Sequence, residues 1–172
     1  MNDSTIATIN NQIIGREAKD LRRLAKEHSA TGAKAILETF YYAFNQQSLP
    51  VFDAVWAPDA LIQLNNPLGG IQRGHVLIRE LYRRIFEGPA TVWVEFYDVV
   101  EYLNAETAVF AGRERGEFTL NGVTVPLDIR TTRVFGYLGA KLGWRQLHHH
   151  GSIDDPELLS VYQTAVNGTK DK

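Results

Sequence analysis

The segment G-W-R-Q-L-H-H-H-G-S, from Gly143 to Ser152, is the stretch from which the fold is most readily inferred. As a β-strand it would alternate its side chains between two faces with a period of two. One face would carry Trp144, Gln146, His148 and His150, and the other Arg145, Leu147 and His149. Two imidazoles and an amide are unusual on a dry core face, because buried polar groups need hydrogen-bond partners. We therefore expect this strand to line a cavity.

Three long strand patterns precede this segment. Residues Thr91 to Leu103, Thr107 to Leu120 and Val123 to Tyr137 are rich in residue types that favour β-structure. The pair Asn121-Gly122 between the last two patterns is the strongest short hairpin signal in the chain. A glycine-rich turn from Gly136 to Gly143 then leads into the last strand.

Helical spacing of apolar residues is found mainly in the first half of the chain. We expect helices over Arg16 to His28, Ala33 to Gln46, a short stretch beginning at Ser48 to Pro50, Arg73 to Phe86, and Pro156 to Val166, with a short strand over Leu61 to Asn65. Residues 1 to 14 are expected to form a mobile arm or a marginal helix. Helices followed by long antiparallel strands are typical of an α+β domain, and a curved meander with helices on its concave side would form a cone-shaped cavity.

Composition narrows the functional classes. The chain has 172 residues, 44% of them hydrophobic and 22% charged, which suits one globular domain. It has no cysteine, so disulfides, thiolate metal sites and a cysteine nucleophile are excluded. The formal net charge is −2 with dispersed basic residues, so we expect no nucleic-acid partner. No apolar run reaches membrane-spanning length and the N-terminus lacks a signal-peptide pattern, so we expect no membrane partner and a cytoplasmic location.

Three further motifs carry a resemblance to a known superfamily. They are A-F-N-Q-Q-S-L followed by V-W-A-P-D-A-L-I (43–62), N-P-L-G-G-I-Q-R-G-H-V-L-I-R-E-L-Y (66–82), and T-R-V-F (132–135) followed by the closing strand. In this order and spacing they resemble the nuclear-transport-factor-2-like superfamily, whose members are also called SnoaL-like or cystatin-like. The resemblance implies an α+β fold in which a curved, mostly antiparallel sheet wraps around N-terminal helices and forms a cone-shaped pocket. It also implies a division into an arm with an extra helix (1–32), the SnoaL-like domain (33–152), and a C-terminal helix with a polar tail (153–172).

The superfamily contains both enzymes and non-catalytic members, so fold alone does not give function. A ketosteroid isomerase needs a carboxylate base where the short strand meets the loop, but that position holds Leu64 or Asn66, depending on the alignment. The helix tyrosine of such a site would be Tyr42, or would be replaced by Phe40. Limonene epoxide hydrolysis needs an arginine and two aspartates, whereas the matching positions read Arg113, Arg115 and Gln146.

A dehydratase-like site would use an inward histidine. His148 or His150 would be a general base, because histidine titrates near neutral pH, and Tyr42, Tyr82 or Asp128 would be its partner. The alternative is that His148 and His150 are structural or lie at a dimer contact. The two imidazoles would also share a face suited to a metal, but no third ligand is evident, so we expect neither a metal nor a cofactor.

The arginines of the middle strands leave two interpretations open. Arg113, Arg115 and Glu117 would share one strand face, with Glu114 opposite; Asp128 and Arg130 would share a face of the next strand, with Arg133 opposite. The first interpretation is a solvated or dimer-forming sheet face with cross-strand ion pairs. The second is one or two arginines inside the pocket that bind a carboxylate or enolate. In the similar association domains of calmodulin-dependent kinases the matching arginines line the cavity, which implies this role for Arg133 and Arg113.

Two hypotheses follow. The first is a SnoaL-like small-molecule enzyme, an isomerase, dehydratase or cyclase that transfers protons on a hydrophobic, aromatic or polyketide-like substrate. The second is a non-catalytic ligand-binding or dimer-assembly domain. A small molecule and a second copy of the chain are the expected partners. The candidate catalytic residues are His148, Tyr42 and Arg113, and the candidate ligand-binding residues are Trp56, Asn66, Tyr82, Phe86, Trp93, Arg115, Arg133 and Gln146.

Overall fold

The computed structural model describes residues 7–167. A seven-stranded sheet has the order β1-β4-β5-β6-β7-β2-β3, in which every pair is antiparallel except β2 with β7. The strands are β1 (Ala7–Asn10), β2 (Gln63–Asn65), β3 (Gln72–Arg73), β4 (Thr91–Leu103), β5 (Thr107–Leu120), β6 (Val123–Tyr137) and β7 (Trp144–Ser152). The helices are the 3-10 turn η1 (Leu24–Lys26), α1 (Ala30–Asn45), α2 (Leu49–Val55), α3 (Gly74–Glu87), α4 (Gly139–Leu142) and α5 (Pro156–Asn167).

Strands β4, β5 and β6 form a long antiparallel meander with the bounds that the sequence predicts. The predicted hairpin between β5 and β6 is confirmed: Asn121 and Gly122 both have positive φ angles, of 52° and 79°. These angles suit the turn type that matches the twist of a two-residue hairpin. The expected α+β fold, with a curved and mostly antiparallel sheet around N-terminal helices, is confirmed.

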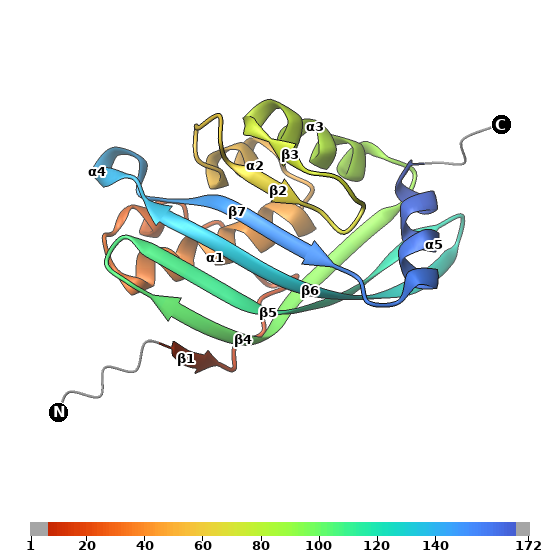
Figure 1. Cartoon of the computed structure of the whole chain (residues 1–172), viewed down its shortest axis with the longest axis horizontal. Helices are drawn as coiled ribbons and strands as arrows, with labels where there is room; N and C mark the ends of the chain where they lie inside the picture. The colour runs from red at the N-terminus through yellow and green to blue at the C-terminus, as the bar shows by residue number, and fades with distance from the viewer. Residues whose placement is uncertain (1–6, 168–172) are drawn as a thin grey trace.

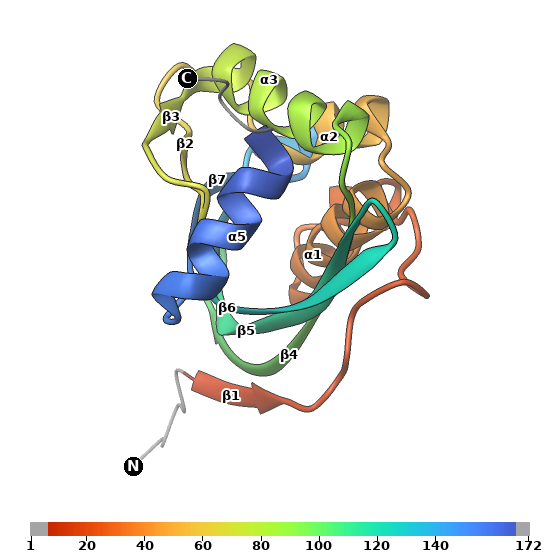
Figure 2. The same cartoon turned by 90° about the vertical axis from the view of Figure 1, so that its right-hand side faces the viewer.

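Helix α1 lies in the concave side of the curved sheet (Figures 1 and 2). Its N-cap is Ser29, whose side chain accepts a hydrogen bond from the Gly32 amide. Its inward side chains pack with α2, α3 and the sheet into one aromatic core. That core includes Phe40, Tyr41, Phe44, Phe52, Tyr82 and Phe96, all less than 9% exposed.

Helix α5 covers one end of the cone. Figure 2 looks at the molecule from that end and shows α5 lying across it, between the sheet and α3. The helix buries Tyr162, Ala165 and Val166, and the Tyr162 ring packs 5.2 Å from the ring of Phe118 on β5. The Gln163 amide also donates a hydrogen bond of 2.9 Å to the carbonyl of Leu68. A C-terminal helix was expected here, but its position as the cover of the cone was not.

The N-terminal segment departs from the sequence prediction. The helix expected over Arg16 to His28 is wrong, because only the turn η1 forms there. Side chains of α1 bind the backbone instead: Glu38 accepts a hydrogen bond from the Lys19 amide, and Thr39 accepts one from the Leu21 amide. The expectation of a mobile arm or marginal helix is also wrong for residues 7–10, which pair with β4 as strand β1; residues 1–6 lie outside the described residues.

Candidate functional site

A one-residue irregularity in β7 decides which histidine enters the cone. On β6, Val134 pairs with His148 and Phe135 pairs with Gln146, so Leu147 is an extra residue, a β-bulge. The alternation shifts by one residue at this point. Gln146 and His149 are therefore buried at 0% and 3% exposure, while His148 and His150 belong to the outer face. The sequence prediction that Gln146, His148 and His150 share one face is wrong beyond Gln146.

Inside the cone, Arg133 on β6 is held by three polar partners. Its Nη2 donates to Glu114 Oε1 at 2.7 Å, its Nε donates to the Tyr41 hydroxyl at 3.0 Å, and its Nη1 donates to Gln146 Oε1 at 3.2 Å. The guanidinium also lies 3.5 Å above the centre of the Phe40 ring. Because Arg133 is 1% exposed, these contacts replace the hydrogen bonds and charge stabilisation that water would otherwise provide.

Tyr41 and Glu114 complete a buried cluster. The Tyr41 hydroxyl donates to Glu114 Oε1 at 2.6 Å, so this oxygen accepts from both the phenol and the guanidinium. Burial is the main cause that raises the pKa of Tyr41 well above its ordinary value, so Tyr41 remains a neutral donor. We call Arg133, Glu114, Tyr41 and Gln146 the Arg133 cluster. Its one positive and one negative charge cancel.

A small cavity adjoins this cluster. The volume open to a water-sized molecule is about 30 Å³, which is room for one or two waters. Its walls are mostly aromatic and aliphatic, and its polar lining groups belong to Asn66, Tyr82, Glu114, Arg133, His149 and Tyr162. Within residues 7–167, both ring nitrogens of His149 and the Nε2 of Gln146 are buried without a hydrogen-bond partner. Such orphaned polar atoms are rare in folded proteins and call for an explanation.

His149 is a neutral imidazole in this environment. Burial is the largest cause that lowers its pKa well below the ordinary value, and the charges of Arg133, His148 and His150 lower it further. Its ring also packs 6.3 Å from the Phe40 ring. A neutral imidazole offers one donor and one acceptor, so His149 can bind a carbonyl or a hydroxyl group but carries no charge to attract an anion.

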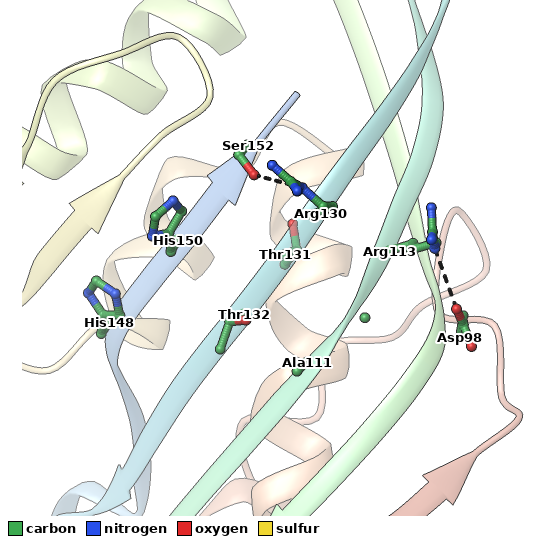
Figure 3. A pocket seen from close by; sticks show the side chains of 10 residues that line it. Asp98, Ala111, Arg113, Arg130, Thr131, Thr132, His148, His150 and Ser152 are labelled. Atoms are coloured by element: carbon green, nitrogen blue, oxygen red, sulfur yellow. Dashed lines mark hydrogen bonds and ion pairs between the residues drawn. The ribbon is translucent and has the colours of Figure 1, made fainter. Parts of the chain in front are cut away.

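The outer face of the sheet holds the other predicted polar residues. Figure 3 shows His148 and His150 on β7, Arg130 on β6, and Arg113 on β5, which points away from the other three. They line an open hollow of about 600 Å³. Both arginines form ion pairs on the surface. Arg113 Nε lies 3.5 Å from Asp98 Oδ2, and Arg130 Nη2 lies 2.6 Å from Asp154 Oδ1. Arg130 Nε also donates a hydrogen bond to the Ser152 hydroxyl.

Comparisons with known proteins agree with this architecture. The family model described as the SnoaL-like domain matches residues 33–156. The chain belongs to the SnoaL-like family. None of the curated proteins that were compared matches this SnoaL-like chain.

Solved structures show the same fold. A protein from Thiobacillus denitrificans, named as a calcium/calmodulin-dependent protein kinase type II association domain, has 26% identity and a TM-score of 0.57 over 71% of this chain and 94% of its own. A protein from Streptomyces avermitilis, named as a dehydratase from the NTF2-like family, has 17% identity and a TM-score of 0.61 over 70% of this chain and 92% of its own. A ketosteroid isomerase-like protein from Erwinia carotovora has 21% identity and a TM-score of 0.60 over 72% of this chain and 95% of its own.

The SnoaL-like domain does not bring the three candidate catalytic residues together. His148 and Arg113 lie on the outer face, where Arg113 is half exposed. Tyr42 is half-buried and does not line the cavity; the tyrosine of α1 that enters the Arg133 cluster is its neighbour Tyr41. The prediction that His148 and Tyr42 would face one pocket is therefore wrong. The β-bulge accounts for His148, and the helical phase of α1 accounts for Tyr42.

The candidate ligand-binding residues divide into three groups. Asn66, Tyr82 and Arg133 line the cavity, and Gln146 is bonded to Arg133. Trp56 and Phe86 are buried in the core but do not line the cavity. Trp93 and Arg115 are on the outer side of the sheet: Trp93 stacks with Arg16 and hydrogen-bonds Glu117, and Arg115 pairs with Glu95 at 2.6 Å. The expectation that Trp93 and Arg115 contribute to an interior pocket is wrong, because strand alternation turns both outward.

Sequence reasoning missed Glu114, Tyr41 and His149 as site residues. The sequence pattern could have identified Glu114, since the alternation that turns Arg113 and Arg115 outward turns Glu114 inward. Tyr41 belongs to the apolar stripe of its helix.

Among residues 7–167, no group of three or more potential ligands is arranged to hold a metal, and no helix is long and apolar enough to cross a membrane.

Proposed function

We propose that this SnoaL-like domain binds a small molecule inside the cone, with the polar end of the ligand on His149 and Gln146. The observation that carries the proposal is that these two buried side chains have polar atoms that face no partner among the described residues. His149 lines the cavity, and Gln146 is fixed by its bond to Arg133. A ligand carbonyl or hydroxyl would supply a partner for one of the two ring nitrogens of His149 and, if it reaches far enough, for the Gln146 amide.

The charge of the site favours a neutral polar group. The guanidinium of Arg133 is already paired with Glu114 and donates a hydrogen bond to the Tyr41 hydroxyl, so it does not need a ligand anion. The walls formed by Phe40, Phe44 and Tyr82 suit an apolar or aromatic body. The ligand class is therefore an uncharged cyclic or aromatic molecule with an oxygen at one end.

The cavity must enlarge for such a ligand to enter. Pockets for small organic ligands usually hold about 300–1,000 Å³, far more than this cavity offers. Tyr162 of α5 is one of the cavity walls, and α5 covers the end of the cone. Displacement of α5 is the opening that we propose.

The same geometry supports proton-transfer chemistry as the second candidate function. Glu114 is an interior carboxylate that lines the cavity, and only its Oε1 is engaged by the cluster. Neutral His149 would donate a hydrogen bond to an oxygen that gains negative charge, and Arg133 would stabilise that charge. This arrangement would suit an isomerase or a dehydratase, with Glu114 as the base in place of the residue absent at Leu64 to Asn66.

The binding proposal is tested with two oxygen-bearing probes, phenol and cyclohexanone, and with toluene as the apolar comparison. We expect both oxygen-bearing probes to raise the melting temperature of the wild-type protein more than toluene does. His149→Leu should abolish this difference, whereas the control His150→Leu, on the outer face, should retain it. Equal stabilisation by all three probes, or no stabilisation by any, would overturn the proposal.

The second copy of the chain is proposed to pack on the outer sheet face. The hollow there has a floor of small residues, Ala111, Gly112 and Thr132, between charged side chains that are already paired. A two-fold dimer uses the same patch on both subunits, and small residues at its centre would let two such faces approach closely. Sedimentation analysis of wild type and Thr132→Arg tests it: we expect a dimer that the substitution converts to a monomer, and a monomeric wild type contradicts the proposal.

A further inference from the structure

A second hollow lies where the N-terminal segment meets the beginning of β7. It has a volume of about 630 Å³ and is lined by Asp20, Leu21, Arg22, Arg23, Leu24, Lys26 and Arg145. We call it the basic hollow. It is separate in composition from the cavity of the cone, since the two share no lining residue.

The charge of the basic hollow is not balanced. Arg22 binds Asp20 through two nitrogens, with distances of 2.9 Å from Nε to Oδ1 and 2.6 Å from Nη2 to Oδ2. Among residues 7–167, no carboxylate pairs with Arg23, Lys26 or Arg145. Three positive charges in one hollow therefore lack a carboxylate partner in the described part of a chain whose formal net charge is −2.

Arg145 is the least satisfied of these cations. It is half-buried, and the one hydrogen bond that its side chain makes to the described residues goes to the carbonyl of Trp144. Burial and the nearby charge of Arg22 both lower the pKa of Arg145. Arg145 thus has four N–H groups that bind none of the described residues and a like charge beside it, so an external anion would stabilise it.

The walls of the hollow are fixed by contacts with the rest of the fold. The Trp144 indole donates to the Glu27 carbonyl at 3.0 Å, and the Tyr137 hydroxyl donates to the Lys26 carbonyl at 3.3 Å. Gly143 has φ of 72°, and a Cβ at this position would collide with the Ala25 carbonyl oxygen, so the backbones of the two segments lie in direct contact. The cations therefore lie on segments that these contacts anchor to the rest of the fold.

From these observations we infer that the basic hollow is a binding site for a small organic or inorganic phosphate. A phosphate accepts the paired N–H groups of an arginine fork, and two or three cations match its charge. Leu21 and Leu24 give the hollow an apolar side that would contact the organic part of a phosphomonoester. A small anion suits the site better than an acidic protein, because Arg145 is half-buried within a concave surface.

Isothermal titration with inorganic pyrophosphate at low and at physiological ionic strength tests the inference. We expect binding to the full chain that weakens with salt, and a loss of about tenfold or more in affinity in Arg145→Gln and in Arg23→Gln, since hydrogen bonds to charged groups carry that much free energy. Arg145→Lys, which keeps the charge but not the fork, should bind with intermediate affinity.

The matched control is Arg83→Gln, because Arg83 lies on α3 and pairs with Glu80 and Glu87. It should bind pyrophosphate as the wild type does. Unchanged melting temperatures without ligand would show that the variants are folded. If the wild type does not bind pyrophosphate, if Arg83→Gln weakens binding as much as Arg145→Gln, or if only a polyglutamate peptide binds, the inference is overturned.

Discussion

Arg133 and Glu114 form a 2.7 Å ion pair between side chains that are 1% and 5% exposed, at the centre of a cone that is otherwise mostly apolar. Removing two charges from water costs several kcal/mol per ion, and a buried pair recovers this only if its remaining hydrogen bonds are made. The bonds from Arg133 to Tyr41 and Gln146 supply part of that compensation. The ion pair joins β5 to β6, and the other two members of the Arg133 cluster join this pair to α1 and β7.

Breaking one half of this pair should be much more harmful than removing both halves. Arg133→Met leaves the Glu114 carboxylate buried with only Tyr41 as donor, and we expect it to cost about 3–5 kcal/mol in the free energy of unfolding. The double variant Arg133→Met, Glu114→Leu removes both charges and should recover most of that loss. Urea denaturation of both variants measures this, and a double variant no more stable than Arg133→Met would contradict it.

Stability should fall with acid because of His149. Its pKa is lowered in the folded state, so the unfolded state binds more protons, and the stabilisation is complete above the unfolded value of about 6.5. It is lost as the pH falls below that value, by up to about 1.4 kcal/mol per pH unit for one proton. His148 also has a lowered pKa and adds a smaller contribution of the same sign.

The comparison of pH 7 with pH 5 by chemical denaturation checks this dependence. His149→Leu should flatten the change in unfolding free energy, because no imidazole remains to be charged at the buried position. His150→Leu, which removes an exposed ring from the same strand, is the matched control and should keep the steep change. A slope that His149→Leu leaves intact would show that other groups cause it.

Helix α5 should open more readily when its bond to the loop after β2 is removed. Gln163→Ala deletes the hydrogen bond to the Leu68 carbonyl, worth about 0.5–1.5 kcal/mol. We expect several-fold faster hydrogen exchange of the α5 amides and faster association of phenol with the cone. The control Thr164→Ala removes a hydroxyl that bonds only within the helix, to the Ser160 carbonyl. Equal exchange rates in both variants would exclude this role of Gln163.

The parts of the structure that sequence predicts well are those fixed by local pattern. The bounds of β4, β5 and β6 follow from long β-favouring runs separated by a hairpin signal. Alternation within each strand correctly places Glu114 opposite Arg113 and Arg115, and Arg133 opposite Arg130. The implied place of Arg113 inside the cavity is wrong. The helix expected over Arg16 to His28 fails because α1 side chains bind that backbone, which is a tertiary effect. The sequence predicts His148 as the inward histidine in place of His149, because one extra residue in a strand exchanges its faces and nothing in the letters H-H-H marks where that residue lies.

The β-bulge makes its own prediction about single-residue deletions in β7. If Leu147 is the extra residue, its deletion restores regular alternation and keeps Gln146 and His149 inward. Because Leu147 is only partly buried, we expect a folded protein that loses roughly 1 kcal/mol of apolar packing. Deletion of Arg145 would instead turn the buried Trp144 outward while Gln146 stays inward, and should abolish cooperative unfolding. Near-ultraviolet circular dichroism and thermal denaturation distinguish the two, and equal damage by both deletions would show that the bulge is not at Leu147.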